Sequence, residues 1–208
     1  MTENEEKPVC LINCGILEKE INRLMEDGAI KVKAYFLPPT LHMDFNELKV
    51  NLEKQLEECS KNCHNGIVVV YGDSCHPEIK DIVRNYGAVK VRGCLNCIEM
   101  LLGKETREKI DPEKAFWYLS PGWCENWEKF LKDSLGWDEK EAKEQLKNIR
   151  KVIFVNTLGN YEEYKKDIEK FREYSGIQQV EKVEVGLEKL KNTLLNAINQ
   201  ALEIKKER

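Results

Sequence analysis

The chain has 208 residues, 34% of them charged, and a formal net charge of −4. This length allows one α/β domain with a substantial core. The acidic balance gives no electrostatic case for nucleic-acid binding, which usually needs a basic face, and no segment reaches the roughly 18 to 20 apolar residues of a membrane span.

The N-terminal segment MTENEEKPV is acidic and polar, unlike a secretory signal, so we expect a cytoplasmic protein. Thiols stay reduced in that compartment. The eight cysteines of the chain therefore favour metal ligation, catalysis or simple burial over disulfides.

Short apolar runs alternate with amphipathic segments along the whole chain. The runs predict strands at residues 9–13, 30–37, 66–71, 88–92, 115–119 and 151–157, with a further candidate at 180–185. Spacings of three and four between apolar residues predict helices at 16–26, 45–63, 77–86, 96–103, 125–135, 138–149, 161–174 and 187–204. This alternation is typical of a Rossmann-like α/β fold, a doubly wound and mainly parallel sheet of about six strands with helices on both faces. We expect a single domain over residues 1–208, with a helical excursion at about 124–149.

Three cysteines fall where a predicted strand gives way to a predicted helix: Cys14, Cys75 and Cys97. In an α/β sheet these junctions share one edge, where ligands bind. A strand order of the flavodoxin type, 2-1-3-4-5, would place Cys14 and Cys75 on either side of the switch point, with Cys97 one strand further along. A helix N-terminus lowers the pKa of a thiol, which favours the thiolate that binds metals. We therefore predict a shared metal site.

The other five cysteines have different interpretations. Cys10 lies inside the first strand, and Cys59 and Cys63 follow the apolar stripe of a helix, so all three are predicted to be small buried hydrophobes. Cys94 is a candidate fourth ligand or a resolving thiol. Cys124 stands at another junction, but its two tryptophan neighbours suggest a packed apolar wall.

Three polar side chains accompany the junction cysteines. His42, in the loop after the second strand, could ligate a metal or act as acid or base, or simply cap the local backbone. Asp73 and His76 flank Cys75 and could transfer protons as catalytic residues, although Asp73 could equally cap a helix. The chain has no phosphate-binding P-loop and no G-x-G-x-x-G motif, so nucleotide binding is unsupported.

Five motifs in this order resemble an uncharacterised family, domain of unknown function 1638, found in methanogenic archaea and bacteria. They are CGILEKEI, LPPTLH, YGDSCHP, GCLNCIEMLLG and WYLSPGWCENW. The resemblance covers nearly the whole chain. The family pattern carries a cysteine at the positions of Cys14, Cys75 and Cys97 and a histidine at that of His42, and the resemblance implies gene neighbours that encode corrinoid-dependent methyltransferases.

The chain departs from the family pattern at two places. Relatives often carry a histidine beside the third cysteine, where this chain has Asn96 and Ile98. Bacterial relatives have a cysteine directly after Tyr-Gly-Asp, where this chain inserts Ser74 before Cys75. No role passes to this chain from the missing histidine.

The main hypothesis is a metal or iron–sulfur protein of anaerobic one-carbon or sulfur metabolism. Cys14, Cys75 and Cys97 would hold a [4Fe-4S] cluster or, as the alternative, zinc, with His42 or Cys94 as the fourth ligand. Two rivals remain open. One is a metal-free thiol enzyme with Cys75 as nucleophile and His76 or His42 as base. The other is a non-catalytic accessory factor with a corrinoid protein or methyltransferase as its partner. The sequence also leaves a homo-oligomer open.

Overall fold

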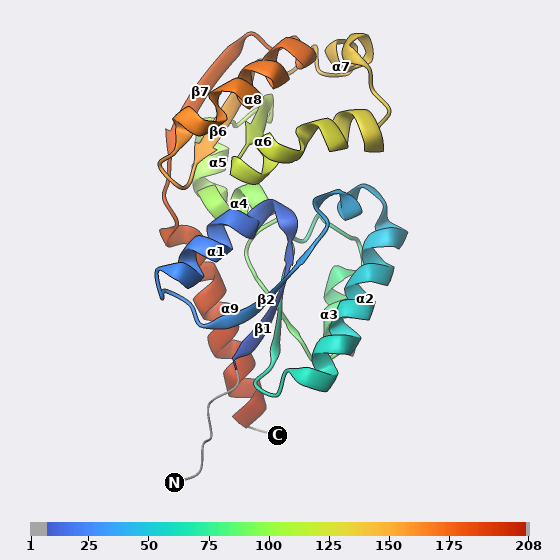
Figure 1. The fold of residues 1–208 in the computed structure, drawn as a ribbon, viewed down its shortest axis with the longest axis vertical. Helices are drawn as coiled ribbons and strands as arrows, with labels where there is room; N and C mark the ends of the chain where they lie inside the picture. The colour runs from blue at the N-terminus through green and yellow to red at the C-terminus, as the bar shows by residue number, and fades with distance from the viewer. Residues whose placement is uncertain (1–7, 207–208) are drawn as a thin grey trace. The chain divides into compact units, whose positions relative to one another are not determined.

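The computed structural model describes residues 8–206 of the chain. These residues divide into two compact units (Figure 1). The first unit contains the described residues up to Cys97 together with those from Leu190 onward, and the second contains Ile98–Lys189. The single domain expected over residues 1–208 stays a prediction.

The first unit is built on a four-stranded parallel sheet with the order β2-β1-β3-β4. Its strands are β1 (Val9–Cys14), β2 (Val32–Leu37), β3 (Ile67–Val70) and β4 (Val89–Lys90). The central strands β1 and β3 are buried along their entire lengths, as their apolar sequences require. This order matches the first four positions of the flavodoxin-type arrangement, so β1 and β3 are neighbours as predicted.

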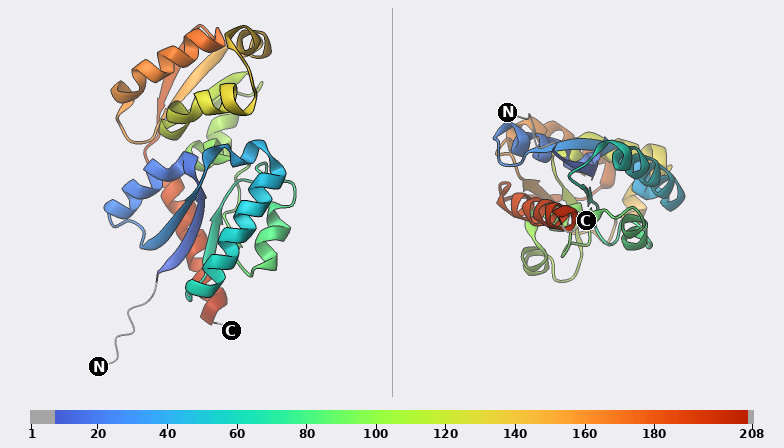
Figure 2. Two further views of the ribbon diagram at one scale, coloured as in Figure 1. Left: turned by 45° about the vertical axis from the view of Figure 1, so that its right-hand side comes forward. Right: turned by 90° about the horizontal axis from the view of Figure 1, so that it is seen from below.

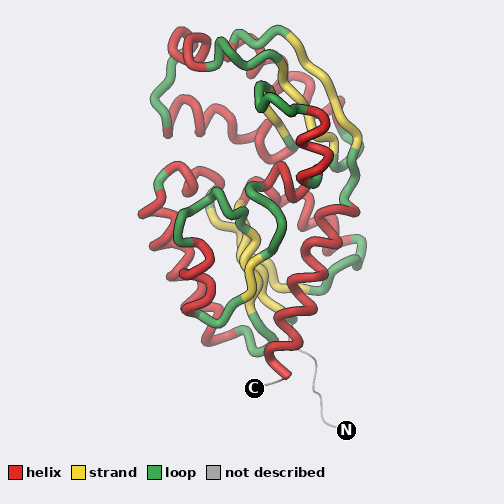
Figure 3. Tube along the Cα trace, turned by 180° about the vertical axis from the view of Figure 1, so that it is seen from behind, coloured by secondary structure: helices red, strands yellow, loops and turns green. Residues whose placement is uncertain are grey.

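Helices cover both faces of this sheet (Figures 1 and 2). They are α1 (Glu18–Glu26), α2 (Phe45–Asn62), α3 (Ile79–Asn85) and α9 (Glu188–Lys206). Helix α1 lies on one face and α2 and α3 lie on the other, as right-handed crossovers on either side of β1 require. The C-terminal helix α9 runs alongside the strands (Figure 3). Short 3₁₀ helices, Gly15–Leu17 and Pro39–Met43, follow β1 and β2.

The second unit has its own parallel sheet with the order β5-β6-β7. Its strands are β5 (Phe116–Leu119), β6 (Lys151–Asn156) and β7 (Gln179–Glu184), and its helices include α5 (Lys104–Ile110), α6 (Pro121–Glu128), α7 (Glu139–Gln145) and α8 (Tyr161–Ser175). A π-helical segment, Lys129–Ser134, continues α6 and forms the predicted helical excursion together with α6 and α7. Trp127 of α6 packs edge-on against Phe171 of α8, with 5.5 Å between ring centroids, inside a core that also includes Phe154 of β6.

The α/β class and the parallel strands are confirmed, but the single sheet of about six strands is not what the structure contains. In residues 8–206, seven strands form two sheets of four and three. Strand β4 has only two residues and ends the first sheet as an edge strand. Alternation of strands and helices shows where strands lie but not which strands pair, so one sheet and two sheets share the same sequence pattern. Within residues 8–206, no helix is long and apolar enough to cross a membrane.

Candidate functional site

The three junction cysteines lie near the carboxyl edge of the first sheet. Cys14 is the last residue of β1, Cys75 lies in the loop after β3, and Cys97 begins α4 (Cys97–Leu102). The thiol of Cys14 is close enough to interact electrostatically with both Cys97 and Cys75. The sheet order explains this convergence, because the adjacent strands β1 and β3 end at the same edge.

Burial controls the ionisation of these thiols. It raises the pKa of Cys14 far above its ordinary value, and the neighbouring Cys97 and Cys75 raise it further. Burial also raises the pKa of Cys75, against the opposing effects of a hydrogen bond with the Gly72 backbone and the charge of Lys90. The expectation of a lowered thiol pKa was therefore wrong for both residues. The free-energy cost of desolvating a thiolate exceeds the stabilisation that a helix N-terminus gives it. The helix after Cys14 is also only a 3₁₀ helix of three residues.

Tyr71 is a candidate site residue that the sequence interpretation missed. It follows β3 directly and is only 1% exposed. Its hydroxyl oxygen is fully buried and has no hydrogen-bond partner among the described residues. Burial raises the pKa of this phenol well above its ordinary value, and the nearby Cys14 and Cys75 raise it further. The phenol is therefore neutral and keeps its proton near these two thiols. A polar terminus on an otherwise apolar strand, IVVVY, was the signal that could have revealed it.

A close contact between two backbone segments positions Cys75. The amide of Asp73 donates to the Cys94 carbonyl at 3.2 Å, and the amide of Ser74 donates to the Leu95 carbonyl at 2.8 Å. A side chain at Gly72 would place its Cβ only 2.1 Å from the Leu95 oxygen. Glycine is therefore required for the loop after β3 to pack against the segment that leads to Cys97.

Asp73 is held by two lysines. Its carboxylate lies 2.7 Å from Nζ of Lys90 and 3.0 Å from Nζ of Lys80. Partial burial acts to raise the pKa of Asp73, but the hydrogen bonds from Lys90 and Lys80 outweigh it and lower the pKa. Lys90 also donates to the carbonyls of Tyr71 and Val91. These contacts give Asp73 a structural role, and its catalytic role stays a prediction.

The two candidate histidines occupy different positions. Nδ1 of the buried His76 accepts a hydrogen bond of 3.0 Å from the Glu78 amide, and its ring packs edge-on against Phe45 at 5.4 Å. His42 lies in the 3₁₀ helix after β2, the strand next to β1. Burial lowers the pKa of His42 despite a hydrogen bond with the Pro39 backbone, so the imidazole is neutral and suited to ligation. The proposed roles of both residues stay predictions.

The two alternate cysteines, Cys94 and Cys124, are both buried. The buried Cys94 directs its thiol to the Arg92 carbonyl at 3.8 Å. Cys124 is 2% exposed and belongs to the hydrophobic core of the second unit, as its tryptophan neighbours suggested.

The motifs around this site agree with a comparison against protein-family models. Residues 36–194 match the family described as "Protein of unknown function (DUF1638)". The chain belongs to this family. The resemblance seen in the sequence motifs is thereby confirmed, and the match includes Cys75, Cys97 and His42 while Cys14 precedes it. Comparisons of the DUF1638 chain with curated proteins and with solved structures gave no match.

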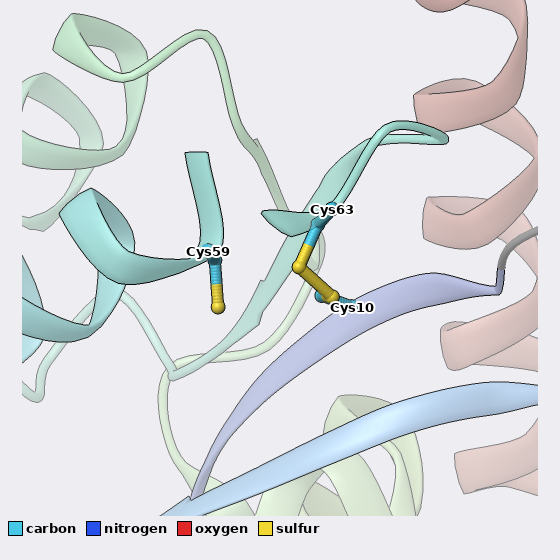
Figure 4. A group of neighbouring side chains, drawn as sticks. All are labelled: Cys10, Cys59 and Cys63. Atoms are coloured by element: carbon cyan, nitrogen blue, oxygen red, sulfur yellow. A yellow bond between two sulfur atoms is a disulfide. The ribbon is translucent and has the colours of Figure 1, made fainter. Parts of the chain in front are cut away.

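A second group of cysteines lies at the opposite edge of the same sheet (Figure 4). Sulfur atoms of Cys10, Cys59 and Cys63 all lie within 4.8 Å of one another, close enough for one metal ion. Cys10 and Cys63 form a disulfide with Cα atoms 5.9 Å apart. Their predicted burial is correct, but the expectation that disulfides were disfavoured was wrong for this pair. Cys10 stands near the start of β1 and Cys63 shortly before β3, so the pairing of these strands brings the residues together.

The DUF1638 protein also has a pocket of about 660 Å³ along the edge strand β4. Basic side chains of Lys80, Arg84, Lys90 and Arg92 line it together with Asp73. The two lysines, Lys80 and Lys90, form ion pairs with Asp73, and Arg84 forms one with Asp81. None of the three junction cysteines is among its lining residues.

Proposed function

We propose that this DUF1638 protein is a cysteine-ligated metal protein whose centre is held by Cys14, Cys75 and Cys97. The observation that carries the proposal is the buried hydroxyl of Tyr71, which lies beside Cys14 and Cys75 without a hydrogen-bond partner in the described chain. A buried hydroxyl without a partner is costly, so its presence among thiols indicates a ligand that accepts its hydrogen bond.

An iron–sulfur cluster fits this group better than a single zinc ion. Zinc–sulfur bonds of about 2.3 Å in a tetrahedral site require sulfur atoms about 3.8 Å apart. Of the residues described, only the Cys10 group satisfies a 4.8 Å limit, so the sulfurs of Cys14, Cys75 and Cys97 are more widely spaced. A [4Fe-4S] cluster accepts wider spacing, because each thiolate binds a different iron.

The fourth position would be filled by His42 or Cys94, or left for a substrate. His42 is neutral and belongs to the same edge, whereas Cys94 already bonds the Arg92 carbonyl. When bound, a cluster of this kind supplies electron transfer or an open iron for a substrate. Tyr71 would hold its proton and donate a hydrogen bond to the bound group. The buried walls around Cys14 would exclude water from it.

The physiological setting that we propose is anaerobic one-carbon or sulfur metabolism. It is supported by the family resemblance, which also suggests a corrinoid protein or methyltransferase as partner and an accessory role as the alternative. A metal-free thiol nucleophile is less well supported, because burial raises the pKa of Cys75 and the backbone occupies Nδ1 of His76.

The test is anaerobic purification or reconstitution with iron and sulfide, followed by metal analysis and visible absorption. We expect about four irons per chain, with loss of the cluster band in Cys14→Ser, Cys75→Ser and Cys97→Ser variants. Cys124→Ser is the matched control, because this cysteine is equally buried but belongs to the core of the other unit. Its metal content should equal that of the wild type.

Two results would contradict the proposal. A protein that takes up no iron or zinc under these conditions has no centre of this kind. Equal loss of metal in the Cys124→Ser control would show that reduced loading reflects general instability.

A further inference from the structure

The sulfur triad of Cys10, Cys59 and Cys63 provides a second site, distinct from the junction cysteines. Cys10 comes from the start of β1, Cys59 from the last turn of α2, and Cys63 from the residue after that helix. Their exposures are 2%, 0% and 9%. Two of the sulfurs share a disulfide and the third is a thiol beside it (Figure 4).

We propose that this triad is a redox-gated site for a soft metal ion, closed by the Cys10–Cys63 disulfide and opened by its reduction. The inference does not depend on the proposed function, because it concerns different residues at the opposite edge of the sheet.

The donor set indicates the class of metal. Among the described residues, no histidine or carboxylate atom joins the three sulfurs within 4.8 Å. Structural zinc almost always takes four protein ligands, whereas thiolate-only donors also select Cu(I). Cys59 is fully buried and Cys10 is 2% exposed, so bulk solvent has little access to two of the three sulfurs. A three-coordinate, sulfur-bound Cu(I) ion therefore matches the triad best.

The surroundings of Cys59 support this assignment. Burial and the charge of Glu58 disfavour a thiolate at Cys59, but Gln55 donates a hydrogen bond of 3.5 Å to its sulfur and Lys33 of β2 contributes a favourable positive charge. Lys33 pairs in register with Cys10 on the neighbouring strand. These contacts partly offset the negative charge that three thiolates would bring into the core.

A small reductant can approach the disulfide from one side. Cys63 lines a pocket of about 150 Å³ together with Ser60, Gly66 and Tyr86. A small dithiol would reduce the Cys10–Cys63 bond to two thiols and would itself be oxidised to a disulfide, which balances two electrons and two protons. Binding of Cu(I) then forms three sulfur–copper bonds and releases up to three thiol protons to solvent, and the copper stays in the +1 state.

The experiment is a competition between the full-length protein and a coloured Cu(I) chelator under anaerobic conditions. We compare two samples. One has the disulfide intact; the other is reduced with a dithiol, which is then removed before copper is added. Because the junction cysteines could also bind copper, both samples are prepared in wild type and in a variant with Cys14, Cys75 and Cys97 replaced by serine. The reduced protein should take one more equivalent of Cu(I) than the oxidised protein in both backgrounds.

A Cys59→Ser substitution should abolish this additional equivalent, whereas Cys124→Ser should leave it unchanged. If Cys59→Ser does not fold, the difference between oxidised and reduced wild type, with X-ray absorption to count sulfur neighbours, decides the question. Equal copper uptake before and after reduction would overturn the proposal, as would additional copper bound by fewer than three sulfurs. The same holds if Cys59→Ser retains the additional equivalent.

Discussion

Replacing Tyr71 with phenylalanine removes one oxygen atom from the candidate metal centre. In the described part of the structure this hydroxyl is fully buried and has no hydrogen-bond partner. An unsatisfied buried polar group costs about 1 to 3 kcal/mol. In metal-free protein, Tyr71→Phe should therefore raise the free energy of unfolding by about that amount, because the ring and its packing are retained.

The measurement is urea unfolding of metal-free, anaerobic protein, monitored by circular dichroism. Tyr174→Phe is the matched control, since its hydroxyl donates to the Trp137 carbonyl at 2.6 Å. That variant should lose about 0.5 to 1.5 kcal/mol, the opposite sign.

Metal loading supplies the second half of the test. If the phenol donates a hydrogen bond to the bound group, Tyr71→Phe should bind the metal more weakly even though its metal-free form is more stable. A destabilised metal-free Tyr71→Phe protein would refute the reasoning, because it would show that the hydroxyl already has a partner.

Three further predictions follow from contacts elsewhere in the chain. Gly72→Ala should lower the free energy of unfolding by about 2 to 4 kcal/mol. The added Cβ would lie 2.1 Å from the Leu95 oxygen and would displace two backbone hydrogen bonds. A loss below about 1 kcal/mol in urea unfolding would contradict this expectation. Burial, with Asp111 nearby, raises the pKa of Tyr118 from 10.0 to about 12, so the unfolded chain releases this proton first. Stability should fall as pH rises from about 10 to 12, and Tyr118→Phe should show a shallower decline in a pH series of unfolding curves. Reduction of the Cys10–Cys63 disulfide, which spans 53 residues, should lower the free energy of unfolding by about 4 kcal/mol, because the unfolded chain regains loop entropy. The stability of a Cys10→Ala variant should not change with the reductant.

The sequence determined most of the local structure. Apolar runs located the seven strands to within about two residues, since periodicity depends only on neighbouring side chains. It also located Cys14, Cys75 and Cys97 between strands and the helices that follow them, and its motifs identified the family. Helix α5 was missed because its sequence, KETREKI, has no apolar stripe to reveal it.

Only the tertiary structure decided which distant groups meet. The division into two sheets, the convergence of Cys10, Cys59 and Cys63, and the buried hydroxyl of Tyr71 all depend on strand pairing and burial across long separations in the chain. Burial also reversed the expected effect of helix termini on the pKa values of Cys14 and Cys75. Desolvation is set by everything packed around a thiol, which a local sequence pattern does not contain.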